Sequence, residues 1–307
     1  MRESFRVSAP GKLMLLGEHA VLHGKLCLVC AVNRRISITV RCRNDQKIHI
    51  TSELGECHGD LNALPPDPAF RFLLAAIAKK SPQLIHGLDL NIKSDFSHKI
   101  GFGSSAAITA AATMLLFALT NGETDLHPIF ADALETIRSV QGEGSGADLA
   151  ASVFGHIVAY RMEPLEIRLH KKHFPITAVY SGSKEPTVKV IEKVKNLWQD
   201  NTEIVDAIFQ AMDKISHAAE EALLAEDWPR FGRLMNVNQG LMDAIGVNNS
   251  TLSEIVYSLR NDPGILGAKI SGAGLGDCVV GLGEPTQNDL PFEALTLGIE
   301  QQGVRFD

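Results

Sequence analysis

The sequence contains no block of basic residues. Its formal net charge is −7 over 307 residues, and the short stretches at 43–47 and 170–173 are typical of solvated turns. Proteins that bind nucleic acid gather lysine and arginine to neutralise the phosphate backbone. The charge pattern therefore argues against a nucleic-acid partner.

The sequence also lacks long hydrophobic runs. Residues 1–12 include no apolar stretch of the kind that a secretory signal needs. The most apolar window, residues 106–119, contains threonines and too few strongly apolar residues for a transmembrane helix. We therefore expect a cytoplasmic protein with no membrane partner.

Cysteine is scarce, with five residues in the chain, and the odd number suits a reducing compartment. Cys27 and Cys30 lie in the apolar run LCLVCAV, residues 26–32, which has neither glycine nor proline. A redox or zinc pair would need exposure and partners. The context favours two buried thiols instead.

What the sequence does contain is the composition of a soluble globular protein, with 45% apolar and 21% charged residues. Its length allows one large domain or two ordinary ones. Runs typical of strands dominate the first fifty residues and recur at 87–94, 155–181, 269–283 and 304–306. Helical spacing is found at 67–80, 104–120, 126–140, 186–262 and near 290–302. We predict an α+β fold in two parts, residues 1–172 and 173–307.

One glycine-bearing motif is GFGSSAA, residues 101–107. Gly101 and Gly103 can adopt backbone angles closed to other residues, and the two serines that follow suit the start of a helix. A helix that starts here directs unpaired N–H groups and a partial positive charge at the loop, where phosphates bind well. The motif is neither a P-loop nor a dinucleotide fingerprint. The same residues would also suit a tight turn that caps a core helix.

A second motif is PGKLMLLGEHAVLHG, residues 10–24. Pro10 and Gly11 predict a turn, after which Lys12 stands at the head of an apolar strand. A cation in that place calls for an anionic partner. Glu18 and His19 follow the strand directly. The alternative is a hairpin with a lysine at its edge and a solvated Glu-His pair.

Two further motifs lie later in the chain. KISGAGLGDCVVGL, residues 269–282, has three glycines that allow an anion to approach the backbone, or it is a loop that leads into a strand. QGEGSGAD, residues 141–148, presents Asp148 just before a turn of small residues. An aspartate there is either a favourable charge at a helix N-terminus or an acid–base residue.

Together, in this order, the motifs resemble those of the GHMP kinase superfamily, and the resemblance covers almost the whole chain. It implies an N-terminal part like ribosomal protein S5 domain 2 and a C-terminal α/β sandwich. Within the superfamily, GEHAVLHG followed by an apolar run and NRR, residues 17–35, is most similar to mevalonate kinases. Gln141 and Gly144 depart from the HGxPSGxD pattern of that family and are closer to phosphomevalonate kinases and some sugar kinases.

The resemblance implies ATP-dependent phosphorylation of a small alcohol, with mevalonate as the expected acceptor. It assigns catalysis to Lys12 and Asp148, with Asp148 as the general base. ATP would bind to Gly101, Phe102, Gly103, Ser104, Ser105, Ala106, Ala107, Gly272 and Gly274. The acceptor would bind to Glu18, His19, Ser145, Gly146 and Ala273. A homodimer is also implied.

A magnesium ion is implied too, but its carboxylate ligand departs from the family pattern. Mevalonate kinases carry a glutamate eleven positions before the aspartate, where this chain has Ile137. We assign Ser105 and Glu135 to the metal, although Glu135 lies on a different helical face; Glu143 is the other nearby carboxylate.

Alternatives for the whole chain are a phosphomevalonate kinase, a GHMP sugar kinase or a non-catalytic protein of the same fold. A phosphorylated acceptor would need extra cations, for which Lys99, Arg138 and Lys184 are candidates.

Overall fold

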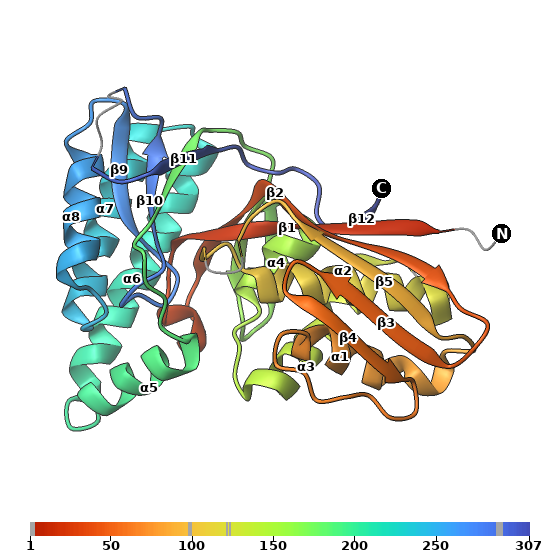
Figure 1. Ribbon diagram of the computed structural model, residues 1–307. Helices are drawn as coiled ribbons and strands as arrows, with labels where there is room; N and C mark the ends of the chain where they lie inside the picture. The colour runs from red at the N-terminus through yellow and green to blue at the C-terminus, as the bar shows by residue number, and fades with distance from the viewer. Residues whose placement is uncertain (1–3, 98–99, 121, 123, 287–290) are drawn as a thin grey trace.

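The computed structural model describes residues 4–97, 100–120, 122, 124–286 and 291–307. Its strands form two sheets with helices packed on them (Figure 1), which confirms the predicted α+β class. None of the helices in these residues is long and apolar enough to cross a bilayer.

The first sheet contains eight described strands in the order β12-β1-β2-β5-β3-β4, with β6 paired to β2 and β7 paired to β6. Its elements are β1 (Phe5–Leu16), β2 (Cys27–Cys42), β3 (Lys47–Ser52), β4 (Gly55–Asp60), β5 (Leu88–Ser94), β6 (Ile157–Arg161), β7 (Glu166–His170) and β12 (Arg305–Phe306). The helices on one face are α1 (Arg71–Lys80), α2 (Ser104–Thr120), α3 (Leu126–Gln141) and α4 (Ala147–Phe154). Short 3-10 helices cover Ala20–His23 (η1) and Ser81–Gln83 (η2).

The second sheet is antiparallel, in the order β11-β8-β10-β9. Helices α7 and α8 pack against it, and α6 packs against α7 (Figure 1). Its elements are β8 (Ile176–Tyr180), α5 (Thr187–Leu197), α6 (Thr202–Leu224), α7 (Trp228–Ala244), α8 (Ser250–Arg260), β9 (Ile265–Ser271), β10 (Cys278–Gly283) and β11 (Ala294–Leu297). The predicted division at residue 172 falls between β7 and β8, that is, between the sheets.

The turn predicted at Pro10 and Gly11 is wrong, because β1 runs through both residues as one strand. Its register against β2 shifts there: Pro10 lies opposite Arg35 and Gly11 lies opposite Val32. Asn33 and Arg34 of β2 therefore have no partner in β1, as in a β-bulge. A bulge is a place where a strand tolerates proline. The irregularity turns β1 toward the GFGSSAA loop, and the Lys12 N–H donates to the Phe102 carbonyl at 2.9 Å.

Helix α2 lies deep in the protein because it carries small residues on most of its surface. Its alanines at 106, 107, 110, 111 and 112 are all 1% exposed or less. A helix that is apolar all round is a core helix. Its contacts with β1, β2, α1, α3 and α4 fix the position of its N-terminus, where the glycine loop begins.

The helix predicted near 290–302 is also wrong for the described residues 291–302. Residues 294–297 form β11, which pairs with β8, and the chain then crosses back to the first sheet, where Val32 bridges Ile299. The last strand, β12, pairs with β1. The C-terminal residues thus join the first sheet and do not follow the predicted division of the chain at residue 172.

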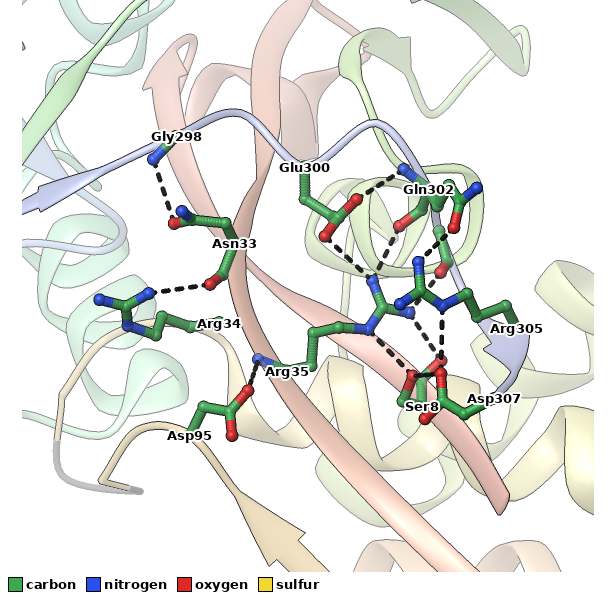
Figure 2. Close-up of polar contacts among 11 residues, drawn as sticks. Ser8, Asn33, Arg34, Arg35, Asp95, Gly298, Glu300, Gln302, Arg305 and Asp307 are labelled. Atoms are coloured by element: carbon green, nitrogen blue, oxygen red, sulfur yellow. Dashed lines mark hydrogen bonds and ion pairs between the residues drawn. The ribbon is translucent and has the colours of Figure 1, made fainter. Parts of the chain in front are cut away.

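Arg35 holds this returning segment in place (Figure 2). Its guanidinium donates to the Ser8 hydroxyl and carbonyl and to the carbonyls of Gln302 and Gly303, at 2.7–3.0 Å. It also lies 3.5 Å from the Glu300 carboxylate, and its side chain is 12% exposed. The guanidinium of Arg35 therefore links β1 and β2 to the C-terminal residues by hydrogen bonds.

We expect Arg35→Ala to lower the free energy of unfolding by about 2–3 kcal/mol, since a hydrogen bond to a charged group contributes roughly 1.5–3 kcal/mol. Urea denaturation measures the change. The neighbouring Arg34 is the control, because its described hydrogen bond is to the adjacent Asn33 carbonyl and it lies at the surface. Equal losses for Arg34→Ala and Arg35→Ala would contradict the assigned role.

Candidate active site

The four motifs of the sequence meet at one cavity of about 180 Å³. Its walls come from the end of β1 and η1, the GFGSSAA loop with the start of α2, the turn before α4, and the β9–β10 loop. The predicted site residues on its surface are Lys12, Glu18, His19, Gly101, Gly103, Ser104, Ser105, Ala106, Ser145, Gly146, Asp148, Gly272 and Ala273.

Lys12 and Asp148 form an ion pair, with 3.0 Å between Nζ and Oδ2. The Lys12 side chain is 6% exposed, whereas that of Asp148 is 45% exposed and faces the cavity. Burial alone would lower the pKa of Lys12, but the carboxylates of Asp148 and Asp277 raise it above its ordinary value. The pair therefore offers a fixed ammonium and an accessible carboxylate side by side.

The GFGSSAA loop lines the cavity with residues 101 and 103–106, and its two glycines leave room for neighbouring charged side chains. Gly103 has φ +71°, and a β-carbon there would lie 2.6 Å from Lys12 Cε; a β-carbon at Gly101 would lie 2.3 Å from Asp277 Oδ1. Only glycine fits either place without a shift of these side chains. Helix α2 starts immediately after, so its free N–H groups and the positive end of its dipole face the cavity. The loop is suited to hold phosphate groups.

Three predicted nucleotide residues lie behind this surface. Phe102 and Ala107 are 1% exposed or less and belong to the core. Gly274 is also buried, where a β-carbon would meet the Val247 carbonyl at 2.4 Å. These three residues shape the cavity wall without lining it.

Residues from the C-terminal part of the chain form hydrogen bonds with the side chains of Glu18 and His19. The buried Lys269 ammonium donates to Glu18 Oε1 and to the Ile270 carbonyl. Burial lowers the pKa of His19, so the ring is neutral at pH 7, and its Nε2–H donates to the Ala273 carbonyl at 2.8 Å. Nδ1 is then the hydrogen-bond acceptor of the ring.

Comparison with known proteins identifies the family. Residues 69–156 match the GHMP kinases N terminal domain, residues 219–291 match GHMP kinases C terminal, and residues 2–42 match the galactokinase galactose-binding signature. A mevalonate kinase from Archaeoglobus fulgidus is 34% identical over 98% of this chain and 99% of its own. The chain belongs to the mevalonate kinase family of GHMP kinases. The resemblance stated from its motifs is thereby confirmed.

Further relatives agree. A mevalonate kinase from Aeropyrum pernix is 29% identical over 100% of this chain and 99% of its own. The crystal structure of L. major mevalonate kinase in complex with R-mevalonate has a TM-score of 0.80, with 22% identity and 96% of each chain covered. The likeness to that structure shows a shared fold.

This GHMP kinase does not bring Glu135 to its cavity. Glu135 lies in α3 with its side chain 73% exposed and 2.5 Å from the Lys79 ammonium. Two positions along a helix turn the side chain by about 200°, and it is Ile137 that faces the cavity. A metal role for Glu135 would need this side chain to turn around the helix, so we do not retain it.

Three charged residues of the cavity were not among the predicted site residues: Glu143, Lys184 and Asp277. Lys184 stands on the loop before α5, and Asp277 stands in the β9–β10 loop. Burial raises the pKa of Asp277, against the opposing pull of Lys184 and Lys12. Asp277 was overlooked because it lies in a glycine-rich loop that was interpreted through its glycines alone. Lys184 was predicted as a candidate cation for a phosphorylated acceptor, but the sequence could not locate it in this cavity.

The cavity also has an apolar wall, to which the sequence motifs assigned no role. Its members are Met14, Val21, Leu22, Ile137, Leu149, Val188 and Ile191. They come from five different elements, so no periodic pattern in the sequence joins them. An apolar wall with a few fixed polar groups is typical of a small-molecule site.

The residues present fit a magnesium ion. Asp277 Oδ1 is buried and accepts no hydrogen bond from the described residues, and Ser105 borders the same cavity. No group of three or more His, Cys, Asp and Glu side chains suited to a metal occurs among residues the structure describes. Mg²⁺ bound with a nucleotide needs no such group, since one or two carboxylates with phosphates and water suffice.

Proposed function

We propose that this GHMP kinase transfers the γ-phosphoryl group of ATP to the primary hydroxyl of mevalonate. The observation that carries the proposal is the Lys12–Asp148 pair, 3.0 Å apart and facing the same cavity as the GFGSSAA loop. Phosphoryl transfer depends on positioning and on charge stabilisation, and these groups can supply both.

The residues act in the following way. The carboxylate of Asp148 accepts a hydrogen bond from the acceptor hydroxyl and takes its proton as the oxygen attacks the γ-phosphorus. The bond from that phosphorus to the β–γ bridging oxygen breaks, and ADP leaves with the electron pair. The Lys12 ammonium and the N–H groups at the start of α2 stabilise the charge on the transferring group. When Mg²⁺ is bound, by Ser105 and a carboxylate, it neutralises charge on the phosphates.

Mevalonate suits the remaining part of the cavity. His19 Nδ1 and Glu18 can meet a hydroxyl, the apolar wall can meet the methyl-branched carbon chain, and Lys184 can pair with the single carboxylate. Glu18 and His19 are therefore proposed as acceptor residues, together with the Ser145–Gly146 turn and Ala273. The buried Tyr160 hydroxyl donates to the Ser145 carbonyl and supports that turn.

The cations of the cavity favour mevalonate over a phosphorylated acceptor. A phosphate calls for a cluster of arginine and lysine. Among the described cavity residues, Lys184 is the cation left after Lys12 has paired with Asp148. Arg138 donates to the Gly144 carbonyl from outside the lining, and Lys99 lies outside the described residues.

A coupled assay of ADP release tests the proposal. Equal concentrations of mevalonate, 5-phosphomevalonate and galactose are compared with ATP and Mg²⁺. We expect kcat/KM for mevalonate to exceed the others by at least about 10⁴-fold, the ratio by which a polar site rejects a mismatched substrate. Galactose is included because of the signature match at residues 2–42. Faster turnover of 5-phosphomevalonate or galactose would reassign the acceptor, and nucleotide binding without any turnover would favour a silent protein.

The location and assembly of the enzyme are also proposals. All five cysteines are free and four of them are buried, which supports a reducing cytoplasm. A homodimer and the absence of a nucleic-acid partner remain predictions. Light scattering on the purified protein measures the first, and a salt-dependent gel shift with DNA and RNA measures the second.

A further inference from the structure

Asp277 has a backbone conformation that is uncommon for residues other than glycine. Its φ is +68°, a region that glycine occupies readily and that aspartate and asparagine adopt, at a modest cost, more often than other residues do. Two backbone hydrogen bonds fix this turn: the Asp277 N–H donates to the Ser183 carbonyl at 2.7 Å, and the Ser181 N–H donates to the Asp277 carbonyl at 2.8 Å. A strained residue of this kind is retained at functional sites, where its side chain is needed in one direction.

The Asp277 side chain is directed at the GFGSSAA loop and the Gly272 turn, which together form the proposed nucleotide site, here called the nucleotide cradle. Oδ1 lies so close to Gly101 that a β-carbon there would be 2.3 Å away, and Oδ2 would be 3.8 Å from a β-carbon at Gly272. The Asp277 carboxylate thus stands between the two glycine loops that border the cavity. Oδ1 is buried and has no hydrogen-bond partner among the residues the structure describes.

The other carboxylates of the cavity are already engaged or exposed. Glu18 is bonded to Lys269, and Asp148 is paired with Lys12. Glu143 lies exposed at the opening. Only Asp277, among the described lining residues, combines a fixed direction with a buried oxygen that has no partner.

A bare carboxylate beside a polyphosphate is unfavourable, because like charges repel strongly where water is scarce. A buried polar atom without a partner adds a further cost. A divalent cation between the carboxylate and the phosphates removes both penalties. Oxygen atoms are the ligands that Mg²⁺ prefers.

We propose that Asp277 is the carboxylate ligand of the Mg²⁺–nucleotide complex in this protein, together with Ser105, which lines the same cavity. The inference rests on the proposed kinase function, since it needs a nucleotide in the cradle. It assigns the metal to the β9–β10 loop and leaves Asp148 free for the acceptor hydroxyl. A counter-ion for Lys12 or Lys184 is the alternative role for Asp277.

Binding experiments on the full chain separate the two roles. ADP affinity is measured by calorimetry against Mg²⁺ concentration, and Mn²⁺ binding in the presence of ADP is measured by electron paramagnetic resonance. Asparagine tolerates positive φ, so Asp277→Asn preserves the turn, and Asp277→Gly relaxes it. We expect both variants to weaken the metal-dependent gain in ADP affinity and the Mn²⁺ signal by at least roughly 10–100-fold, the loss seen when a residue that merely supports a metal ligand is changed. Glu135→Gln is the matched control and should change neither.

The outcomes are distinct. Metal-dependent ADP binding that is unchanged in both folded Asp277 variants would overturn the metal role and leave the kinase function standing. If the wild-type protein bound no nucleotide with or without metal, the proposed function itself would fail, and this inference with it. Thermal melting of each variant verifies that it is folded.

Discussion

Replacing Asp148 by asparagine is expected to lower kcat by about 10²–10⁴-fold, the usual contribution of a general base. The amide fills the same space and can still accept a hydrogen bond, but it cannot take the proton of the acceptor hydroxyl. ATP affinity should change little, because the proposed phosphate site is the GFGSSAA loop and the start of α2, not Asp148. Single-turnover kinetics and calorimetry with a non-hydrolysable nucleotide measure the two quantities separately.

The control for Asp148→Asn is the same change at Asp200, an exposed residue after α5 that does not line the cavity. We expect this variant to retain wild-type turnover. Near-normal kcat in Asp148→Asn would refute the assignment of the base. Loss of ATP binding together with turnover would indicate that Asp148 serves the nucleotide.

Replacing Lys269 by methionine is expected to lower the free energy of unfolding by about 3–5 kcal/mol, the usual cost of removing one partner from a buried ion pair. Lys269 is 0% exposed and Glu18 is 2% exposed. Without the ammonium, the one hydrogen bond that the described residues still give the Glu18 carboxylate is a long one, 3.4 Å from Asn238 Nδ2. Denaturation in urea, followed by circular dichroism, measures the change.

A double-mutant cycle makes this prediction specific. Glu18→Gln combined with Lys269→Met removes both charges, and replacing a whole buried pair by uncharged groups costs far less than breaking it. The double variant should therefore recover much of the lost stability. Its activity should stay low, because Glu18 is a proposed acceptor residue. A double variant that is no more stable than Lys269→Met would show that the effect comes from packing alone.

Several features could be read from the sequence because they depend on local chemistry. The serines and spacing of residues 104–120 predicted α2, the spacing of residues 126–140 predicted α3, and the glycine motifs predicted which loops border the cavity. Asp277 and Lys184 could not be found in this way. Some 170 to 265 residues of sequence separate them from Lys12, with which they line one cavity. The pairing of β8 with β10 brings their loops together.

The errors also have physical causes. Residues 291–302 were predicted to be helical from their apolar spacing, but the open edge of β8 pairs with 294–297 and outweighs that weak preference. Pro10 and Gly11 were interpreted as a turn because these residues usually break strands. Glu135 was assigned although it lies on a different helical face from Ile137, and the structure places its side chain away from the cavity, against Lys79.

The pairing of β12 with β1 has a consequence for how the protein matures on the ribosome. Strand β1 is synthesised long before β12, so this edge of the sheet stays uncovered until residues 305–306 have left the ribosome. Until then the edge is a template for pairing with other nascent chains, and its closure joins residues about 300 positions apart. Covering this edge is therefore a late event in the folding of the enzyme.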